Sequence, residues 1–109
     1  MAYDALAAER VRSWIGRKRG FEEKSMFGGI GFLLNGNMCV GIWKESLVLR
    51  IGTDASESYL EQDDVGEFDI TGRSMTGWVL VAPDGFDTDS QLATHLESAV
   101  KFTRTLPAK

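Results

Sequence analysis

Residues 26–43 read MFGGIGFLLNGNMCVGIW, which places two apolar runs on either side of Asn35-Gly36-Asn37. An Asn-Gly pair between apolar runs is typical of a β-hairpin, because both residue types tolerate positive φ. We therefore expect a hairpin at the centre of the fold. The stretch contains no catalytic or metal-binding pattern, so it predicts architecture and no chemistry.

The length of the turn determines which side chains share a face, because a one-residue change moves one strand to the opposite face. With a three-residue loop Leu34 lies opposite Met38, and one face collects large apolar residues: Ile30, Phe32, Leu34, Met38, Val40 and Ile42. The other face then carries Gly29, Gly31, Leu33, Cys39, Gly41 and Trp43. A two-residue loop mixes large and small residues on both faces, so we favour the three-residue loop.

The second of these faces has low relief, because its glycines leave room for another backbone to come close. One interpretation is that a layer of the same subunit packs on it. The alternative is that a partner subunit or a flat ligand binds there. The candidate interaction residues, on this face and near it, are Phe27, Gly28, Gly29, Gly31, Gly41, Trp43, Arg50 and Trp78.

The composition of the 109-residue chain, 43% hydrophobic and 26% charged, fits a single globular domain over residues 1–109. Twelve basic and sixteen acidic residues give a net charge of −4, which argues against general binding to nucleic acid or to anionic membranes. The single cysteine, Cys39, cannot form an internal disulfide, and the sequence shows no signal segment and no membrane-spanning run. We therefore expect a cytoplasmic protein.

Apolar residues at helical spacing predict a first helix over residues 3–18, with Asp4 at its start and Gly20 as its stop. Basic side chains are frequent at its end: Arg10, Arg12, Arg17, Lys18 and Arg19. At about 100° per residue they project to several sides, whereas a DNA-binding surface clusters its charge. We favour a solvated helix and keep DNA contact through these five residues as the lesser alternative.

Further strands are expected at residues 21–27, 47–51 and 75–82, and residues 68–70 also read as extended. A short helix capped by Thr53 or Asp54 is expected to reach about residue 62. Thr88 begins a capping box ahead of a C-terminal helix. The predicted fold is α+β: an antiparallel β-sheet, a meander with a central hairpin, flanked by N- and C-terminal helices and one short helical insertion.

Three residues are the candidates for chemistry. Arg50, the one charged residue on an apolar strand, either reaches solvent or an internal ion pair, or anchors a carboxylate or phosphate. Cys39 and His95 are the only possible thiol–imidazole pair, but a free cysteine is usually buried, and His95 is expected on the flank of the helix's apolar stripe, at the boundary between its buried and exposed sides. We expect no catalytic residue, no metal and no cofactor, with a small enzyme or redox-responsive protein using Cys39 as the alternative.

Four motifs follow one another between two amphipathic helices: Met26-Phe27-Gly28-Gly29, Asn35-Gly36-Asn37-Met38-Cys39, Arg50-Ile51-Gly52 and Met75-Thr76-Gly77-Trp78-Val79. Together they resemble the N-terminal domain of the TfoX/Sxy family over nearly the whole chain. The resemblance implies a small bacterial α+β domain, in a family whose two-domain members regulate natural-competence genes at the level of transcription. Those members continue into a second, helical domain that this sequence does not contain, so the resemblance alone carries over neither the competence role nor any DNA contact made by that domain. It also supplies no catalytic residues.

These observations predict a non-enzymatic interaction or regulatory module, linked to the regulation of competence or other gene expression. The sheet is expected to be apolar on both faces, which is more than three helices can cover. We therefore expect a homodimer, or binding to another protein that the sequence does not identify.

Overall fold

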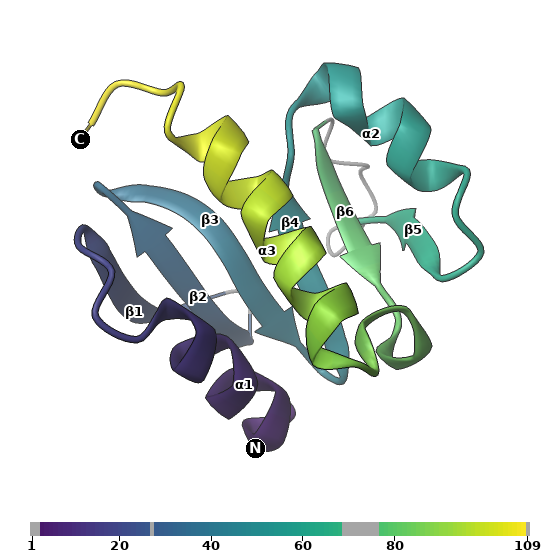
Figure 1. Cartoon of the computed structure of the whole chain (residues 1–109), viewed down its shortest axis with the longest axis horizontal. Coiled ribbons are helices and arrows are strands. Elements are labelled where there is room, and N and C mark those ends of the chain that lie inside the picture. The colour runs from purple at the N-terminus through teal and green to yellow at the C-terminus, as the bar shows by residue number, and fades with distance from the viewer. Residues whose placement is uncertain (1–2, 27, 69–76, 109) are drawn as a thin grey trace.

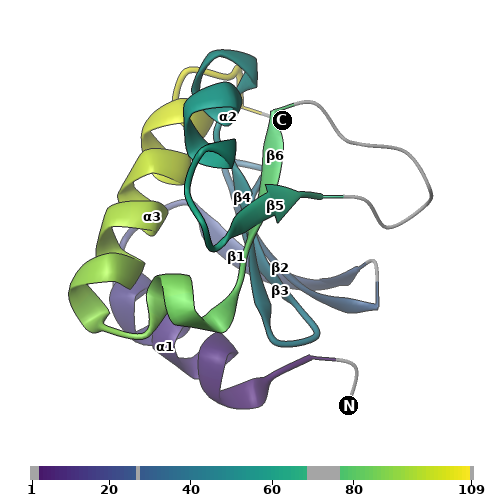
Figure 2. The same cartoon turned by 90° about the vertical axis from the view of Figure 1, so that its right-hand side faces the viewer.

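The computed structural model describes residues 3–26, 28–68 and 77–108. Within them, a six-stranded antiparallel sheet carries the α-helices on one of its two faces (Figures 1 and 2). The predicted α+β class is confirmed. In chain order the elements are α1 (Ala5–Ile15), β1 (Phe21–Met26), β2 (Gly29–Leu34), β3 (Asn37–Trp43), β4 (Ser46–Arg50), α2 (Thr53–Leu60), β5 (Val65–Glu67), β6 (Trp78–Val81), the 3₁₀ turn η1 (Pro83–Phe86) and α3 (Asp89–Thr103).

Both long helices begin with side-chain caps that the sequence indicates. Asp4 Oδ1 accepts hydrogen bonds from the backbone N–H groups of Leu6 and Ala7, at 2.9 and 3.3 Å. Thr88 and Gln91 form the reciprocal capping box at the start of α3, as predicted. Helix α1 ends at Ile15 with Gly16 as its C-cap, so the expected end at residue 18 is three residues too late.

The turn between β2 and β3 is one residue shorter than expected. Asn35 and Gly36 form it alone, since Leu34 pairs directly with Asn37. Their φ angles of 52° and 84° are the two positive values that a type I′ turn requires. The three-residue loop is therefore wrong, because this Asn-Gly pair satisfies the tighter turn that matches the twist of the strands.

A β-bulge follows the turn and restores the pairing of the large residues. Leu33 pairs with Met38 while Phe32 pairs with Val40, so Cys39 is the extra residue on β3. Met38 therefore shares the face of Leu33, and Cys39 is buried with the core. The expected faces of Met38 and Cys39 are wrong for this reason.

Strands β1 to β4 form the predicted meander, but the far edge departs from chain order. The order across the sheet is β1-β2-β3-β4-β6-β5, because β6 pairs with β4 and leaves β5 at the edge. The sequence interval between β4 and β6 carries α2, which covers the same sheet face as α1 and α3 (Figure 2). A strand, β5, lies at Val65–Glu67, directly before the extended segment predicted at residues 68–70; residues 69 and 70 of that prediction lie outside the described residues.

The core lies between the helices and the inner face of the sheet. Its largest fully buried side chains are Phe32, Ile42, Leu47, Leu49, Leu96, Val11, Val40, Val79 and Val81. The members of this set that lie on β2, β3, β4 and β6 project to the inner face of the sheet. Because side chains alternate along a strand, other residues of the same strands form the opposite face.

Helix α2 begins at Thr53, and its N-cap residue, Gly52, has a φ angle of 87° and provides no side-chain cap. The expected cap at Thr53 or Asp54 is wrong, because Gly77 O instead accepts hydrogen bonds from the backbone N–H groups of Ile51 and Gly52, at 2.9 and 3.1 Å. A Cβ added at Gly52 would lie 2.5 Å from the ring of Phe102. The close packing of α3 against the start of α2 therefore requires glycine at position 52.

We expect Gly52→Ala to lower the free energy of unfolding by about 3 kcal/mol, through backbone strain and collision with the Phe102 ring. Gly66→Ala is the matched control, because a Cβ at Gly66 meets nothing within 4 Å, and its effect should stay within about 0.5 kcal/mol. Urea unfolding followed by circular dichroism measures both. Equal stability of the two variants would contradict the assigned packing of Gly52.

Candidate functional site

The sheet face opposite the helices is set by strand pairing, because antiparallel partners project to the same side. We name it the tryptophan face; its residues are Gly29, Gly31, Leu33, Met38, Gly41, Trp43, Val48, Arg50, Trp78 and Leu80. The glycines and Val48 are buried and the other side chains are half-buried. No helix of the described residues lies on this side of the sheet (Figure 2).

Six of the predicted interaction residues lie together on the tryptophan face: Gly29, Gly31, Gly41, Trp43, Arg50 and Trp78. Gly28 lies in the turn before β2, and Phe27 is outside the described residues. Sequence reasoning did not select Met38 and Leu80 as site residues. Alternation with Trp78 along β6 could have found Leu80, whereas the place of Met38 depends on the bulge.

Aromatic rings from three separate segments form one cluster on this face. The ring of Phe68, which follows β5, has its centroid 6.4 Å from that of Trp43 and 5.9 Å from that of Trp78. Strand β4 lies between those two tryptophans in the sheet, so Phe68 spans it, and Val48 of β4 is fully buried. Aromatic pairs at these separations attract one another, which holds both indoles in fixed positions.

Arg50 lies flat on the tryptophan face beside this cluster. Its guanidinium carbon is 5.3 Å from the centroid of the Trp78 ring, a cation–π contact. Its Nη1 donates to Met38 O at 3.4 Å, near the upper limit for a hydrogen bond. Among the ion pairs of the described residues none involves Arg50, so the internal ion pair considered from the sequence is not found there. Most of its five N–H donors therefore remain for a partner.

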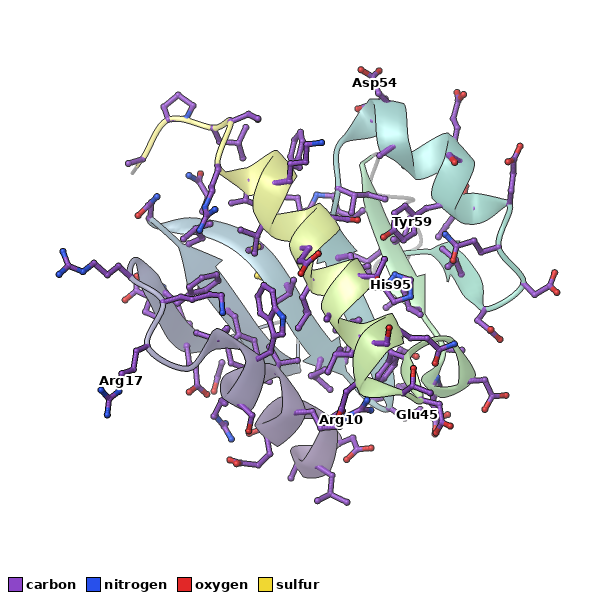
Figure 3. The ribbon with its side chains drawn as sticks, viewed as in Figure 1. Arg10, Arg17, Glu45, Asp54, Tyr59 and His95 are labelled. Atoms are coloured by element: carbon purple, nitrogen blue, oxygen red, sulfur yellow. The ribbon has the colours of Figure 1, made fainter. Side chains whose placement is uncertain are left out.

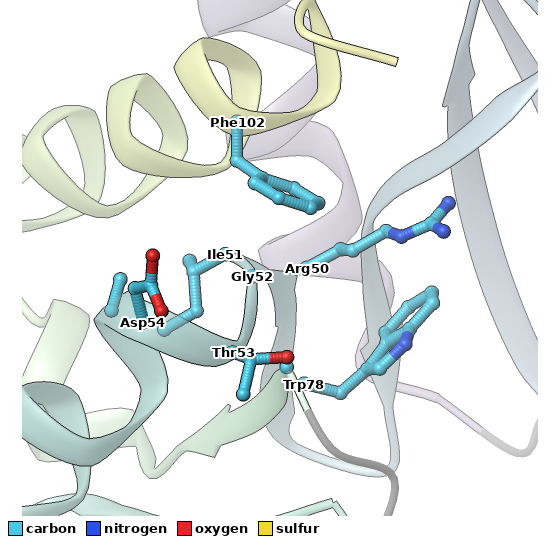
Figure 4. Close-up of a pocket in the computed structure, with 9 residues that line it drawn as sticks. Arg50, Ile51, Gly52, Thr53, Asp54, Trp78 and Phe102 are labelled. Atoms are coloured by element: carbon cyan, nitrogen blue, oxygen red, sulfur yellow. The ribbon is translucent and has the colours of Figure 1, made fainter. Parts of the chain in front are cut away.

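A cavity of about 500 Å³ opens beside Arg50 (Figure 4). Its lining residues are Arg50, Ile51, Gly52, Thr53, Asp54, Ala55, Gly77, Trp78 and Phe102. The uncapped amides at the start of α2 favour an anion, but the carboxylate of Asp54 belongs to the same wall and opposes one.

His95 is buried, and both of its ring nitrogens are hydrogen-bonded, whereas the sequence predicts a residue at the boundary between the buried and exposed sides of the helix. Its Nε2 lies 2.9 Å from Gly85 O, to which it donates, and Tyr59 donates its hydroxyl to Nδ1 at 3.2 Å (Figure 3). Tyr59 of α2 covers the ring, which explains the burial. Both ring nitrogens are occupied in structural hydrogen bonds, so His95 lacks the free nitrogen that a catalytic base needs.

Cys39 is fully buried in the core next to α3. Burial raises the pKa of the Cys39 thiol above its ordinary value of 9.0, and a hydrogen bond with Thr103 and the charges of Arg50 and Arg104 lower it by less. A raised pKa keeps the thiol neutral, and the thiolate is the reactive form. The geometry therefore gives no support to a nucleophile or redox centre at Cys39.

We expect Cys39 to resist alkylation by iodoacetamide in the folded protein up to pH 9. In the unfolded chain the thiol ionises as the pH rises toward 9.0, so labelling should accelerate there, whereas the raised pKa delays ionisation in the folded protein to higher pH. Mass spectrometry of the folded protein and of the same protein in urea measures both rates. Equal rates in the two samples would contradict the buried thiol.

Two of the basic residues on α1 are bound to acidic neighbours. Arg10 Nη2 lies 3.5 Å from Asp89 Oδ1. Arg12 contacts Glu9 at 2.6 Å and Glu23 at 2.8 Å, and its hydrogen bonds to them raise the pKa of its guanidinium. These contacts neutralise part of the charge that a DNA-binding helix would present.

The other three basic residues follow α1, in the segment before β1. Lys18 Nζ donates to Trp14 O at 2.9 Å and lies 4.5 Å from the centroid of that indole ring. Arg17 and Arg19 are exposed, and Arg17 projects away from the ribbon, far from Arg10 (Figure 3). The structure therefore does not gather the five cations into one surface.

We expect no saturable binding of duplex DNA at physiological salt, because paired cations and a net charge of −4 leave too few free charges to neutralise phosphates. Fluorescence anisotropy of a labelled bacterial duplex, titrated at low and at physiological salt, measures this. Binding that survives physiological salt and disappears in the Arg17→Glu/Arg19→Glu variant would contradict the expectation.

The described residues contain no group of three His, Cys, Asp or Glu side chains able to hold a metal ion. In the same residues, no helix has the length and apolar character needed to cross a bilayer. The fold and its site thus define a small α+β domain with an aromatic sheet face.

The TfoX N-terminal domain family matches residues 15–103 of the chain. This range begins at the last residue of α1 and ends at the last residue of α3, so it contains every strand of the sheet. The chain belongs to the TfoX N-terminal domain family, and the resemblance seen in its motifs is confirmed. A search of the curated proteins found no match.

Proposed function

We propose that this protein is a non-enzymatic regulatory module that acts by binding another protein through the tryptophan face. The observation that carries the proposal is the composition of that face. Trp43, Trp78, Met38 and Arg50 lie together on it, half-buried, on a sheet side where the described helices do not pack. Tryptophan, methionine and arginine are enriched at protein interfaces, and the residues that dominate binding energies are most often tryptophan, tyrosine and arginine.

The rigidity of this face supports the same function. Phe68 holds both tryptophan rings, and Trp78 in turn supports the guanidinium of Arg50. Side chains that are already fixed lose little conformational entropy when a partner binds. The aromatic cluster is therefore prepared for association before the partner arrives.

The family supports a regulatory role, because the TfoX N-terminal domain family is linked to the regulation of competence. We propose that the protein influences the expression of competence genes, or of other genes, through a protein contact. The buried, unpaired Cys39 suits the reducing cytoplasm, where we place this function. The bonded His95 and the neutral thiol support a module without catalysis.

In a naturally competent bacterium whose own copy is replaced, we expect Met38→Lys to abolish the effect of the wild-type chain on competence transcripts. The substitution places a charge on the tryptophan face, which an apolar interface cannot accommodate at low cost. Leu6→Lys is the matched control, because Leu6 is 77% exposed on α1 and should tolerate the charge without effect.

Transcript abundance by quantitative sequencing measures the effect, and circular dichroism shows that both variants are folded. A folded Met38→Lys variant that regulates like the wild-type chain would contradict the role of the face. A wild-type chain without any effect on transcripts would contradict the regulatory role.

A further inference from the structure

Strand pairing aligns three side chains in one row that runs from the edge strand β1 onto the tryptophan face, and the side chain of Arg50 continues that row. Glu22 of β1 pairs with Leu33 of β2, and Leu33 pairs with Met38 of β3. Arg50 of β4 lies next in the row, since it donates to Met38 O. We name Glu22, Leu33, Met38 and Arg50 the charged row; it begins with a negative side chain, continues with two apolar ones and ends with a positive one.

The charged row is complementary to its own reverse. A two-fold axis that runs parallel to the strands between β2 and β3, midway between two stacked sheets, reverses the row in the second copy. Glu22 then faces Arg50 of the second copy, and Leu33 faces Met38 of the second copy. A two-fold axis repeats each contact, so both charges of both chains are paired. Sheets that pack face to face keep their strands within about 30° of one another, which long side chains such as glutamate and arginine can span.

Resting on the proposed protein-binding function of the tryptophan face, we propose that its partner is a second copy of this chain, related by this axis. Charge complementarity selects this occupant. Glu22 is exposed and Arg50 half-buried, and neither belongs to an ion pair within the described residues. An acidic partner would satisfy Arg50 but repel Glu22, whereas a second copy satisfies both.

The position of the proposed two-fold axis can be compared with the part of the tryptophan face that the Phe68 ring covers. Phe68 contacts Trp43 and Trp78 and spans β4, on the β6 side of the face. The axis lies between β2 and β3, on the other side of Trp43. The axis places β1 of the second copy over β4, so Glu22 of that copy reaches Arg50 beside the Phe68 ring, and the cluster supports Arg50 from the side.

Analytical ultracentrifugation of the whole chain over a concentration series tests the dimer. We expect Glu22→Arg and Arg50→Glu each to weaken dimerisation by about tenfold or more, because each brings like charges together twice. The double variant restores opposite charges and should recover most of the wild-type affinity. Glu97→Arg, on the exposed side of α3, is the control of equal charge change and should leave dimerisation unchanged.

A wild-type chain that remains monomeric at the highest concentration reached would overturn the second copy as the partner. A dimer that both single variants, Glu22→Arg and Arg50→Glu, leave intact would overturn the axis. If Arg50→Glu does not fold, variants of the exposed Glu22 test the proposal. Glu22→Gln should weaken the dimer less than Glu22→Arg does. If neither variant changes dimerisation, the proposal is overturned. The transcript test of Met38→Lys is independent of the test of the dimer. If the wild-type chain is a monomer and Met38→Lys still abolishes regulation, the tryptophan face binds a different protein partner, and the proposed function stands.

Discussion

The pairing of β2 with β3 is the constraint on which the rest of the structure depends. The tight Asn35-Gly36 turn alone would carry the large residues of β3 to the wrong face, because side chains alternate along a strand. The bulge at Cys39 reverses that shift within two residues of the strand's start, so that Val40 joins Phe32 in the core. Every later pairing, from β4 to β6, inherits this register.

The bulge also explains which parts of the site the sequence could predict. Simple alternation placed Gly31, Gly41 and Trp43 on one face correctly, because these residues lie on strand segments with regular pairing. It failed at Met38, since no local pattern distinguishes a longer loop from a tight turn followed by a bulge. The order of the strands in the sheet could not be predicted from local pattern either. It depends on the pairing of β6 with β4, and the interval between these two strands contains α2 and β5.

The helices were easier to predict than the chemistry of their side chains. Asp4 and Thr88 mark helix starts through hydrogen bonds within three residues, which a sequence displays directly. The partners of Arg12 and His95 lie on other elements: Glu23 belongs to β1, and Tyr59 belongs to α2. Spacing along one helix could show that the basic residues of α1 diverge, but only the tertiary structure shows which of them are neutralised and that Cys39 is enclosed beside α3.

The sheet has two edges and one face on which none of the described helices packs, and its edges are poorly suited to association. Strand β1 carries Glu22, Glu23 and Lys24, and charges on an edge strand oppose pairing with another chain. Strand β5 has only three residues, too few for a stable strand pair. Glu22 belongs to this charged edge strand, where it opposes pairing with another chain. It also projects from β1 to the same side of the sheet as Leu33, which is the side of the tryptophan face. In the dimer that we propose, the same charge that opposes pairing at the edge faces Arg50 of the second copy across the tryptophan face.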